Sequence, residues 1–112
     1  MDVERLRGVF ERTPGVRDRL FTAEEIAYCE NVADPLVHFA GTLAAKEATV
    51  KALGLESIHR WAQKIFVTRD KSGAPAVTVE GEVGGLALSI SHDGGIAIAV
   101  VIKVDWDRSQ ST

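Results

Sequence analysis

A helical repeat of apolar residues occupies the middle of the chain, between Pro35 and Gly54. Apolar side chains recur there at every third or fourth position, which places them on one face of an α-helix. They are Leu36, Phe39, Leu43, Val50 and Leu53. Proline suits the first turn of a helix, and glycine suits the position after the last turn. The sequence therefore predicts one long helix over this segment, on which the rest of the fold packs.

Two shorter helices are predicted ahead of the long one. Residues 3–12 carry apolar side chains at helical spacing and are followed by a Pro-Gly pair that ends the pattern. Thr22 is followed three residues later by Glu25, the spacing of a capping box at the start of a helix. We therefore expect the second helix to begin at Thr22 and to end near Val32.

Two β-hairpins are predicted after the long helix. Residues 64–69 and 76–80 have the composition of strands and flank a turn-rich segment. Residues 86–92 and 96–103 also have a strand pattern and are joined by Asp-Gly-Gly, which suits a tight turn. Helices followed by a mainly antiparallel sheet indicate the α+β class. We expect a single domain over residues 1–112.

Composition excludes several classes of function. At 112 residues with 46% hydrophobic residues, the chain has the makeup of one folded domain, and its net charge of -3 disfavours a nucleic-acid partner. The longest apolar stretch, residues 96–102, is too short to span a bilayer, so we expect no membrane partner. Cys29 is the only cysteine, which excludes an internal disulfide and suits the cytosol.

Positive charge is concentrated at the start of the chain, in Arg5, Arg7, Arg12, Arg17 and Arg19. Aspartates and glutamates lie among these arginines, so the pattern alone favours a solvated face with little net charge. A docking surface for an acidic partner is the alternative interpretation.

Glu47 does not suit a plain apolar helix face. It lies four positions after Leu43 and three before Val50, where burial of a carboxylate is costly unless its charge is offset. Lys51, four residues later, can reach it on the same face of the helix. Spacing alone favours an ordinary ion pair, and a metal ligand is the alternative.

His92 presents a similar choice at the end of a predicted strand. It follows Leu86, Leu88 and Ile90 on one face and precedes a glycine turn. A lone histidine there usually hydrogen-bonds a backbone carbonyl, but strand ends and turns also carry ligand-binding groups. Both interpretations stay open on this pattern.

The residues around Glu47 carry a family resemblance. The run L-A-A-K-E-A-T-V-K-A-L-G at residues 43–54 resembles the signature W/F-A-A-K-E-A-x-x-K-A-L-G of holo-acyl-carrier-protein synthases, the small 4′-phosphopantetheinyl transferases. Further segments are similar in order and spacing, so that the resemblance covers nearly the whole chain. They are Val3-Glu4-Arg5, Leu20-Phe21-Thr22, Gly73-Ala74-Pro75 and Leu88-Ser89-Ile90-Ser91-His92.

The resemblance implies a reaction and a set of site residues. A serine hydroxyl of acyl carrier protein attacks the β-phosphate of coenzyme A and releases adenosine 3′,5′-bisphosphate, a step of fatty acid or polyketide synthesis. Glu47 matches the ligand of a Mg²⁺ ion, which prefers oxygen donors. Lys51 matches the lysine that reaches the pyrophosphate, and His92 matches the histidine that contacts a coenzyme A phosphate. Gly54 and Pro75 match positions that line the nucleotide pocket.

The resemblance also implies partners. Arg5, Arg17 and Arg19 fall where the family presents cations to acyl carrier protein. Members of the family assemble as homotrimers, with each active site in the cleft between neighbouring subunits.

The chain departs from the family pattern at three places. The family opens with a strand G-I-D-x-V-E-x-x-R whose aspartate is a second metal ligand, and alignment on Arg5 puts that aspartate two positions ahead of Met1. We expect Asp2 to point to the opposite face of this strand. Thr42 replaces a usual arginine, and Leu55-Glu56 replaces a usual Thr-Gly.

Two explanations of the missing aspartate are open. Either the N-terminal strand is truncated in this sequence and the site is otherwise intact, which we favour, or the site has been lost. The second explanation leads to a non-catalytic homologue that binds coenzyme A or carrier protein without transfer, and a small interaction protein with no ligand is a third possibility.

Overall fold

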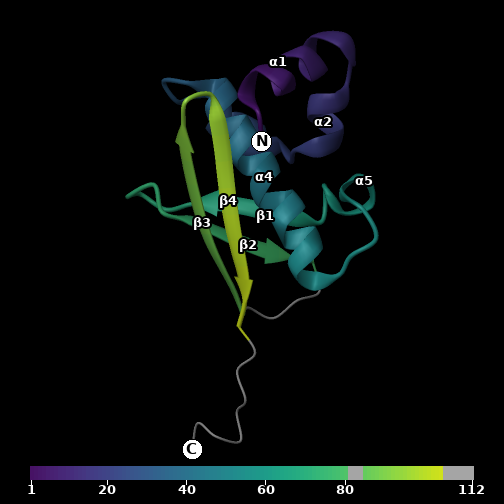
Figure 1. The fold of residues 1–112 in the computed structure, drawn as a ribbon, viewed down its shortest axis with the longest axis vertical. Helices are drawn as coiled ribbons and strands as arrows, with labels where there is room; N and C mark the ends of the chain where they lie inside the picture. The colour runs from purple at the N-terminus through teal and green to yellow at the C-terminus, as the bar shows by residue number, and fades with distance from the viewer. Residues whose placement is uncertain (81–84, 105–112) are drawn as a thin grey trace, which may run out of the picture.

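The computed structural model describes residues 1–80 and 85–104. Five helices precede four strands within these ranges, so the predicted α+β class is confirmed (Figure 1). The helices are α1 (Val3–Arg12), α2 (Val16–Leu20), α3 (Ala23–Glu30), α4 (Pro35–Leu53) and α5 (Ile58–Trp61). The strands are β1 (Ile65–Arg69), β2 (Pro75–Val79), β3 (Leu86–Asp93) and β4 (Ile96–Lys103). None of the helices in the described ranges is long and apolar enough to cross a membrane.

The helix predictions were confirmed at the longer elements and missed the two shortest. The capping box at Thr22 is present, because its hydroxyl accepts from the Glu25 amide and the Glu25 carboxylate accepts from the Thr22 amide. The helix that follows ends at Glu30, two residues before the predicted end. Helices α2 and α5, of five and four residues, are too short to show an apolar repeat.

Helix α4 is central to the fold (Figure 1). It begins at a proline and is capped by Gly54, whose φ of 66° lies in the left-handed region that glycine adopts without strain. Phe39, Ala40 and Leu43 of α4 pack into one buried cluster with α1, α2 and α3. Ala45 packs into a second cluster with β1 and β2. The helix therefore joins the helical half of the molecule to the sheet half.

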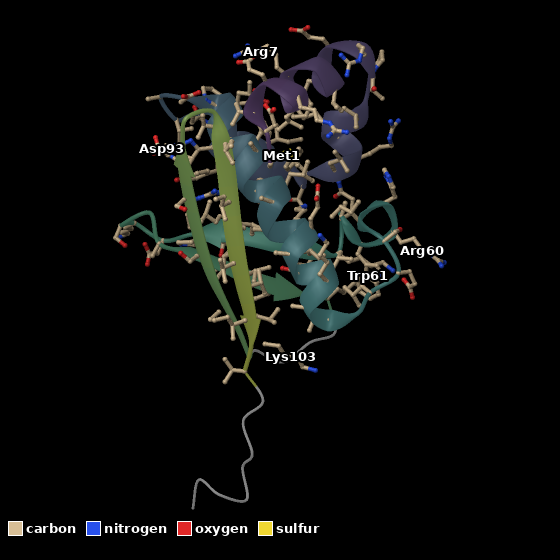
Figure 2. The ribbon with its side chains drawn as sticks, in the orientation of Figure 1. Met1, Arg7, Arg60, Trp61, Asp93 and Lys103 are labelled. Atoms are coloured by element: carbon tan, nitrogen blue, oxygen red, sulfur yellow. The ribbon has the colours of Figure 1, made fainter. Side chains whose placement is uncertain are left out.

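The strands form two antiparallel hairpins, as the sequence predicts. Strand β1 pairs with β2 in the register Ile65↔Val79 to Arg69↔Pro75. Strand β3 pairs with β4 so that His92 lies opposite Ala97. Asp93 and Lys103 mark the two ends of this second hairpin (Figure 2).

The two faces of β4 differ sharply. Ala97 is fully buried and belongs to the cluster of the helical half. The alternate residues of β4 and the one after it form an exposed apolar row, with exposed fractions from 47% to 57%. They are Ile96, Ile98, Val100, Ile102 and Val104.

The first residues pair with the start of β4. Met1 donates its amino group to the carbonyl of Ala97 and accepts the Ala97 amide on its own carbonyl, both at 2.8 Å. Asp2 forms an isolated antiparallel bridge with Ile96, and its side chain caps α1 by accepting from the amides of Glu4 and Arg5. The chain thus passes from extended backbone into α1 at Asp2.

Candidate active site

Glu47 lies at a cavity between α4, α1 and α5. The cavity has a volume of about 610 Å³, within the range of roughly 300–1,000 Å³ typical of small-molecule sites. Both apolar and polar residues line it, among them Met1, Asp2, Arg5, Leu43, Ile58 and His59. Glu47 is half-buried there, and the cavity leaves room for a ligand beside its carboxylate.

The carboxylate of Glu47 has no hydrogen-bond or ion-pair partner within residues 1–80 and 85–104. The side-chain hydrogen bonds and ion pairs found in these ranges do not include it, and the pairing with Lys51 that spacing favours is not formed. A half-buried carboxylate without a cation retains the capacity to hold one. The geometry therefore disfavours the interpretation of Glu47 as half of an ordinary ion pair with Lys51.

The cavity contains one further acidic residue, Asp2. Asp2 borders the same cavity as Glu47, although the sequence predicts it on the opposite face of a strand from the family's aspartate. It is not the middle of a strand but the N-cap of α1, and its Oδ1 accepts from the amides of Glu4 (3.0 Å) and Arg5 (3.2 Å). No cluster of three or more His, Cys, Asp or Glu side chains suited to a metal occurs within the described ranges. A carboxylate with phosphate and water ligands is nevertheless a common Mg²⁺ site.

Lys51 and Gly54 lie farther along α4. Lys51 is one turn beyond Glu47 on the same side of the helix, about 6 Å along its axis, and its side chain is exposed. Gly54 caps the end of the helix and is also exposed. Neither residue lines the cavity of Glu47.

His92 and Pro75 lie together at a second, smaller cavity. It has a volume of about 220 Å³ and lies between α3, α4 and the strands. His92 is exposed at the end of β3, whereas Leu86, Leu88 and Ile90 on its side of the strand are half-buried. Its ring centroid lies 6.4 Å from that of His38, for which no role was predicted. Glu47 and His92 of one chain thus lie at different cavities.

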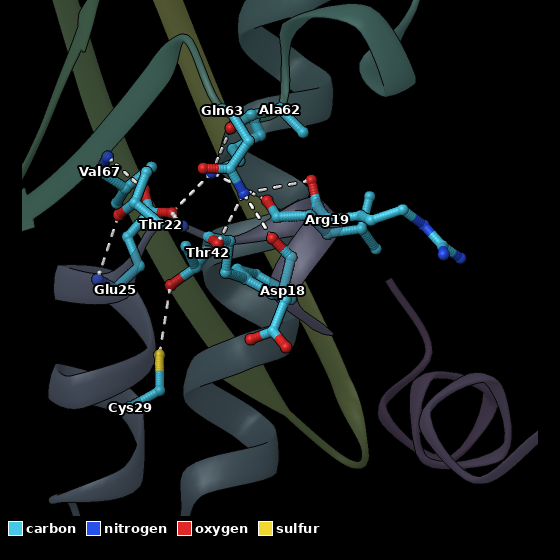
Figure 3. A network of polar contacts seen from close by, with 12 residues as sticks. Asp18, Arg19, Thr22, Glu25, Cys29, Thr42, Ala62, Gln63 and Val67 are labelled. Atoms are coloured by element: carbon cyan, nitrogen blue, oxygen red, sulfur yellow. Dashed lines mark hydrogen bonds and ion pairs between the residues drawn. The ribbon is translucent and has the colours of Figure 1, made fainter. Parts of the chain in front are cut away.

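The arginines predicted to dock a partner differ in their surroundings. Arg5 borders the cavity of Glu47. Arg17 stacks on the rings of Phe10 and Phe39, at 4.7 and 5.1 Å from the centroids, and lies 3.9 Å from a carboxylate oxygen of Glu30. Arg19 points away from the neighbouring polar network (Figure 3). Arg17 therefore has a structural role within the helical half as well as an exposed position.

A buried ion pair beside the site was not predicted. The Lys46 ammonium lies 2.6 Å from Glu25 and donates to the carbonyls of Leu20 (2.9 Å) and Ala62 (2.6 Å). Glu25 also accepts from the backbone amide of Val67 at 2.8 Å (Figure 3). Burial lowers the pKa of Lys46, while its hydrogen bond to the carboxylate and the charge of that group act in the opposite direction.

This ion pair fixes the walls of the larger cavity. Leu20 lines that cavity, and Ala62 directly follows α5, whose Ile58 lines it as well. Lys46 therefore ties α2 and α5 to the turn of α4 that carries Glu47. The only sequence signal was the capping box, which identified Glu25 but not its second role.

Cys29 is not a catalytic group. Its side chain is fully buried, and burial raises the pKa of the thiol. A neutral buried thiol is a poor nucleophile.

Comparison with known proteins identifies the family. Residues 1–101 match the 4'-phosphopantetheinyl transferase superfamily. The chain is 41% identical over 111 residues to a holo-[acyl-carrier-protein] synthase of Beutenbergia cavernae, covering 91% of this chain and 90% of that protein. It is also 41% identical to part of the fatty acid synthase subunit alpha of Candida albicans, of which it spans only 6%.

A solved structure shares the fold. A holo-(acyl-carrier-protein) synthase from Bacillus anthracis, crystallised in complex with CoA (3',5'-ADP), superposes with a TM-score of 0.77 at 27% identity, over 94% of this chain and 91% of that one. The sequence match, the superposition and the position of the motif on α4 agree. The chain belongs to the 4'-phosphopantetheinyl transferase superfamily.

Proposed function

We propose that this chain is a holo-acyl-carrier-protein synthase, which transfers 4′-phosphopantetheine from coenzyme A to a serine of acyl carrier protein. The observation that carries the proposal is Glu47, which matches the metal-binding glutamate of the family and lies half-buried at a cavity of about 610 Å³, without an ion-pair partner among the described residues. Relatives of nearly the same length are holo-[acyl-carrier-protein] synthases, which supports the same activity.

Glu47 fits the role of a Mg²⁺ ligand. Its oxygen donors are of the kind that Mg²⁺ prefers, and Mg²⁺ sites commonly use one or two carboxylates together with substrate phosphate and water. When bound, the ion would neutralise charge on the pyrophosphate oxygens of coenzyme A. The protein then contributes the position of Glu47, which α4 and the Lys46 ion pair hold in place.

Lys51 and His92 have positioning and charge-neutralising roles in this proposal. Lys51, on the same side of α4 as Glu47, is free to extend toward the pyrophosphate and to stabilise the departing bisphosphate. His92 offers a ring nitrogen to a phosphate of coenzyme A, and Pro75 and Gly54 line the nucleotide path. Phosphoryl transfer needs such positioning more than covalent help from the protein.

Arg5 and Arg19 are the cations best placed to receive acyl carrier protein. Both are exposed, and Arg5 also borders the cavity of Glu47. Arg17 is held by two aromatic rings, so we expect it to contribute more to the shape of the docking face than to contact with the carrier protein. Docking beside the cavity would bring the serine hydroxyl close to the reacting phosphate.

A second carboxylate fits ahead of Met1. The backbone of Met1 pairs with Ala97 as an extended segment, and residues two apart on a strand share a face. An aspartate two positions ahead of Met1 would therefore lie on the same face as Met1, which borders the cavity of Glu47. Alignment of the family's Val-Glu on Val3-Glu4 instead puts the place of the aspartate at Met1 itself, on this same face. Asp2 is the competing candidate, although one of its oxygens already caps α1.

The exposed row of β4 supports a homotrimer. Five large apolar side chains in a row form the kind of surface that marks an interface between proteins. Assembly around this row would also allow the two cavities to meet across a subunit boundary. Sedimentation velocity tests this: Ile98→Asp should yield monomers, whereas Thr78→Asp on the exposed side of β2 should leave the assembly intact.

Mass spectrometry of carrier protein tests the activity. Apo acyl carrier protein, coenzyme A and Mg²⁺ are incubated with the chain, and with a chain extended at its N-terminus by Gly-Ile-Asp-Val. The proposal predicts the mass gain of one phosphopantetheine group. No gain with either chain would contradict the enzyme, and coenzyme A binding without transfer would instead indicate the non-catalytic homologue.

Two asparagine variants identify the second carboxylate. Asparagine caps helices as well as aspartate does, so Asp2→Asn removes the charge but retains the cap. If the added aspartate is the ligand, Asp2→Asn leaves transfer by the extended chain unchanged, and asparagine at the added position abolishes it. The reverse result would assign the role to Asp2.

A further inference from the structure

The smaller cavity contains a cation that the family motif does not provide. Arg69, the last residue of β1, is half-buried and lines this cavity together with His92. Its guanidinium lies 4.8 Å from the ring centroid of Tyr28 and donates to the hydroxyl of Thr42 at 3.3 Å. Position 42 is where the family usually has an arginine. A guanidinium from another element therefore lies next to the position that lost one.

The surroundings hold Arg69 in this place. The Thr42 hydroxyl donates to the carbonyl of His38 at 2.8 Å, so its lone pairs are free to accept from Arg69. A side chain on Gly41 would bring its Cβ to 2.9 Å from Ile90 and 3.9 Å from the Arg69 guanidinium, so glycine keeps the space open. Arg69 also lies opposite Pro75 in the β1–β2 pairing. The guanidinium is thus positioned by contacts with α3 and α4.

The charge of Arg69 is not offset by a carboxylate. No aspartate or glutamate lines the cavity, and the ion pairs found in residues 1–80 and 85–104 do not include Arg69. The adjacent Asp70 is engaged in its own turn, where one carboxylate oxygen accepts from Ser72 and from the amide of Ala74. A guanidinium with free donors in a cavity without acidic groups suits a phosphate, which it can bind with two parallel hydrogen bonds.

We propose that Arg69 binds a phosphate group of coenzyme A in the cavity of His92, in place of the cation that position 42 lacks. The proposal rests on the function proposed above. The cavity of about 220 Å³ is smaller than a site for a whole cofactor, so it takes the phosphate and its attachment only. Because Glu47 and Lys51 are assigned to the pyrophosphate, the phosphate left for Arg69 is the 3′-phosphate.

Calorimetry with two forms of coenzyme A tests this assignment. Coenzyme A and 3′-dephospho-coenzyme A are titrated into the wild-type protein and into Arg69→Gln, Arg69→Lys and Arg60→Gln. Arg60, exposed on α5 far from the β3–β4 hairpin, is the control for loss of one positive charge (Figure 2). We expect Arg69→Gln to weaken coenzyme A binding about 10- to 100-fold. Arg69→Lys, which keeps the charge but not the paired donors, should lose less, and Arg60→Gln should bind as the wild type does.

The form without the 3′-phosphate should bind equally to wild type and Arg69→Gln. If Arg69→Gln weakens the binding of both forms equally, Arg69 contacts the pyrophosphate, and the 3′-phosphate assignment is overturned. Unchanged coenzyme A affinity in Arg69→Gln would overturn the phosphate role altogether, even if the wild type transfers. If Arg69→Gln fails to fold, the affinities of Arg69→Lys for coenzyme A and for 3′-dephospho-coenzyme A test the assignment by the same criteria. A wild type that transfers nothing but loses coenzyme A affinity on Arg69→Gln would contradict only the proposed function.

Discussion

Lys46 and Glu47 are neighbours in the sequence, yet their charges have opposite surroundings. Lys46 is fully buried, and its three donor directions meet a carboxylate and two backbone carbonyls. Glu47, about 100° farther around α4, is half-buried at an open cavity and has no ion-pair partner in the described ranges. The charge of Lys46 is paired within the chain, whereas the charge of Glu47 is available to a ligand.

This difference in partners indicates which charged residue of a motif is available to bind a ligand. A buried charge that finds every partner inside the chain holds elements together, and removing either member leaves the other desolvated. A charge at a cavity without such partners contributes little to stability and can meet a charged ligand. Stability and activity should therefore separate between these two adjacent positions.

The largest effect is expected at the buried pair. Lys46→Met should lower the free energy of unfolding by about 3–5 kcal/mol, because the Glu25 carboxylate is left buried without its cation. Urea denaturation measures this loss. Lys51→Met is the matched control on the same helix, and its stability should stay within about 0.5 kcal/mol of the wild type because Lys51 is exposed.

A second change sharpens the same test. Glu25→Gln in the Lys46→Met background removes the stranded charge and keeps one acceptor oxygen for either the Thr22 or the Val67 amide, although its NH2 group cannot accept from the other. The double variant should regain part of the stability that Lys46→Met loses. If Lys46→Met were as stable as the wild type, the proposed contribution of the buried Lys46 charge to stability would be contradicted.

The next largest effect is expected at Glu47, and it should appear in activity. Glu47→Gln keeps the size of the side chain and should slow transfer by about 10²- to 10³-fold, because the oxygen ligand loses its charge. Its free energy of unfolding should stay within about 0.5 kcal/mol of the wild type. Carrier-protein mass spectrometry and urea denaturation measure the two quantities. If Glu47→Gln kept full activity but lost much of its stability, Glu47 would have a structural role and not a ligand-binding one.

The smallest effect is expected at Cys29, a residue of α3 that packs against α4. Its thiol contacts the Thr42 hydroxyl at 3.8 Å, and its pKa is raised mainly by burial, so little thiolate is present near pH 8. A chromogenic disulfide reagent should react slowly with the folded protein and rapidly in urea. Transfer activity should be unaffected by brief exposure to the reagent. Rapid labelling of the native protein would show that this side of α4 opens.

Local sequence patterns predicted the elements that carry the site. The apolar repeat located α4 and the glycine that ends it, and the Thr22–Glu25 spacing located the start of α3. These features depend on residues a few positions apart, so they are readable without a fold. The apolar stripe marked Glu47 as a carboxylate whose burial needs a partner, and only the family resemblance then predicted it as a metal ligand.

The sequence did not predict which charges find partners. It favoured a Glu47–Lys51 ion pair and gave no role to Lys46, His38 or Arg69. The two carbonyl partners of Lys46 lie 16 and 26 residues away, and Thr42 lies 27 residues from Arg69. No local repeat reports contacts over such separations.

The sequence by itself determined the family, the order of the elements and the carboxylate on the long helix, because these depend on short-range spacing and on residue identity. Tertiary structure alone decided that Lys46 is buried, that Glu47 borders a cavity, and that Arg69 contacts Thr42, at the position where the family usually has an arginine. Solvent exposure and the proximity of distant charges are set only when α4 packs between the helices and the strands.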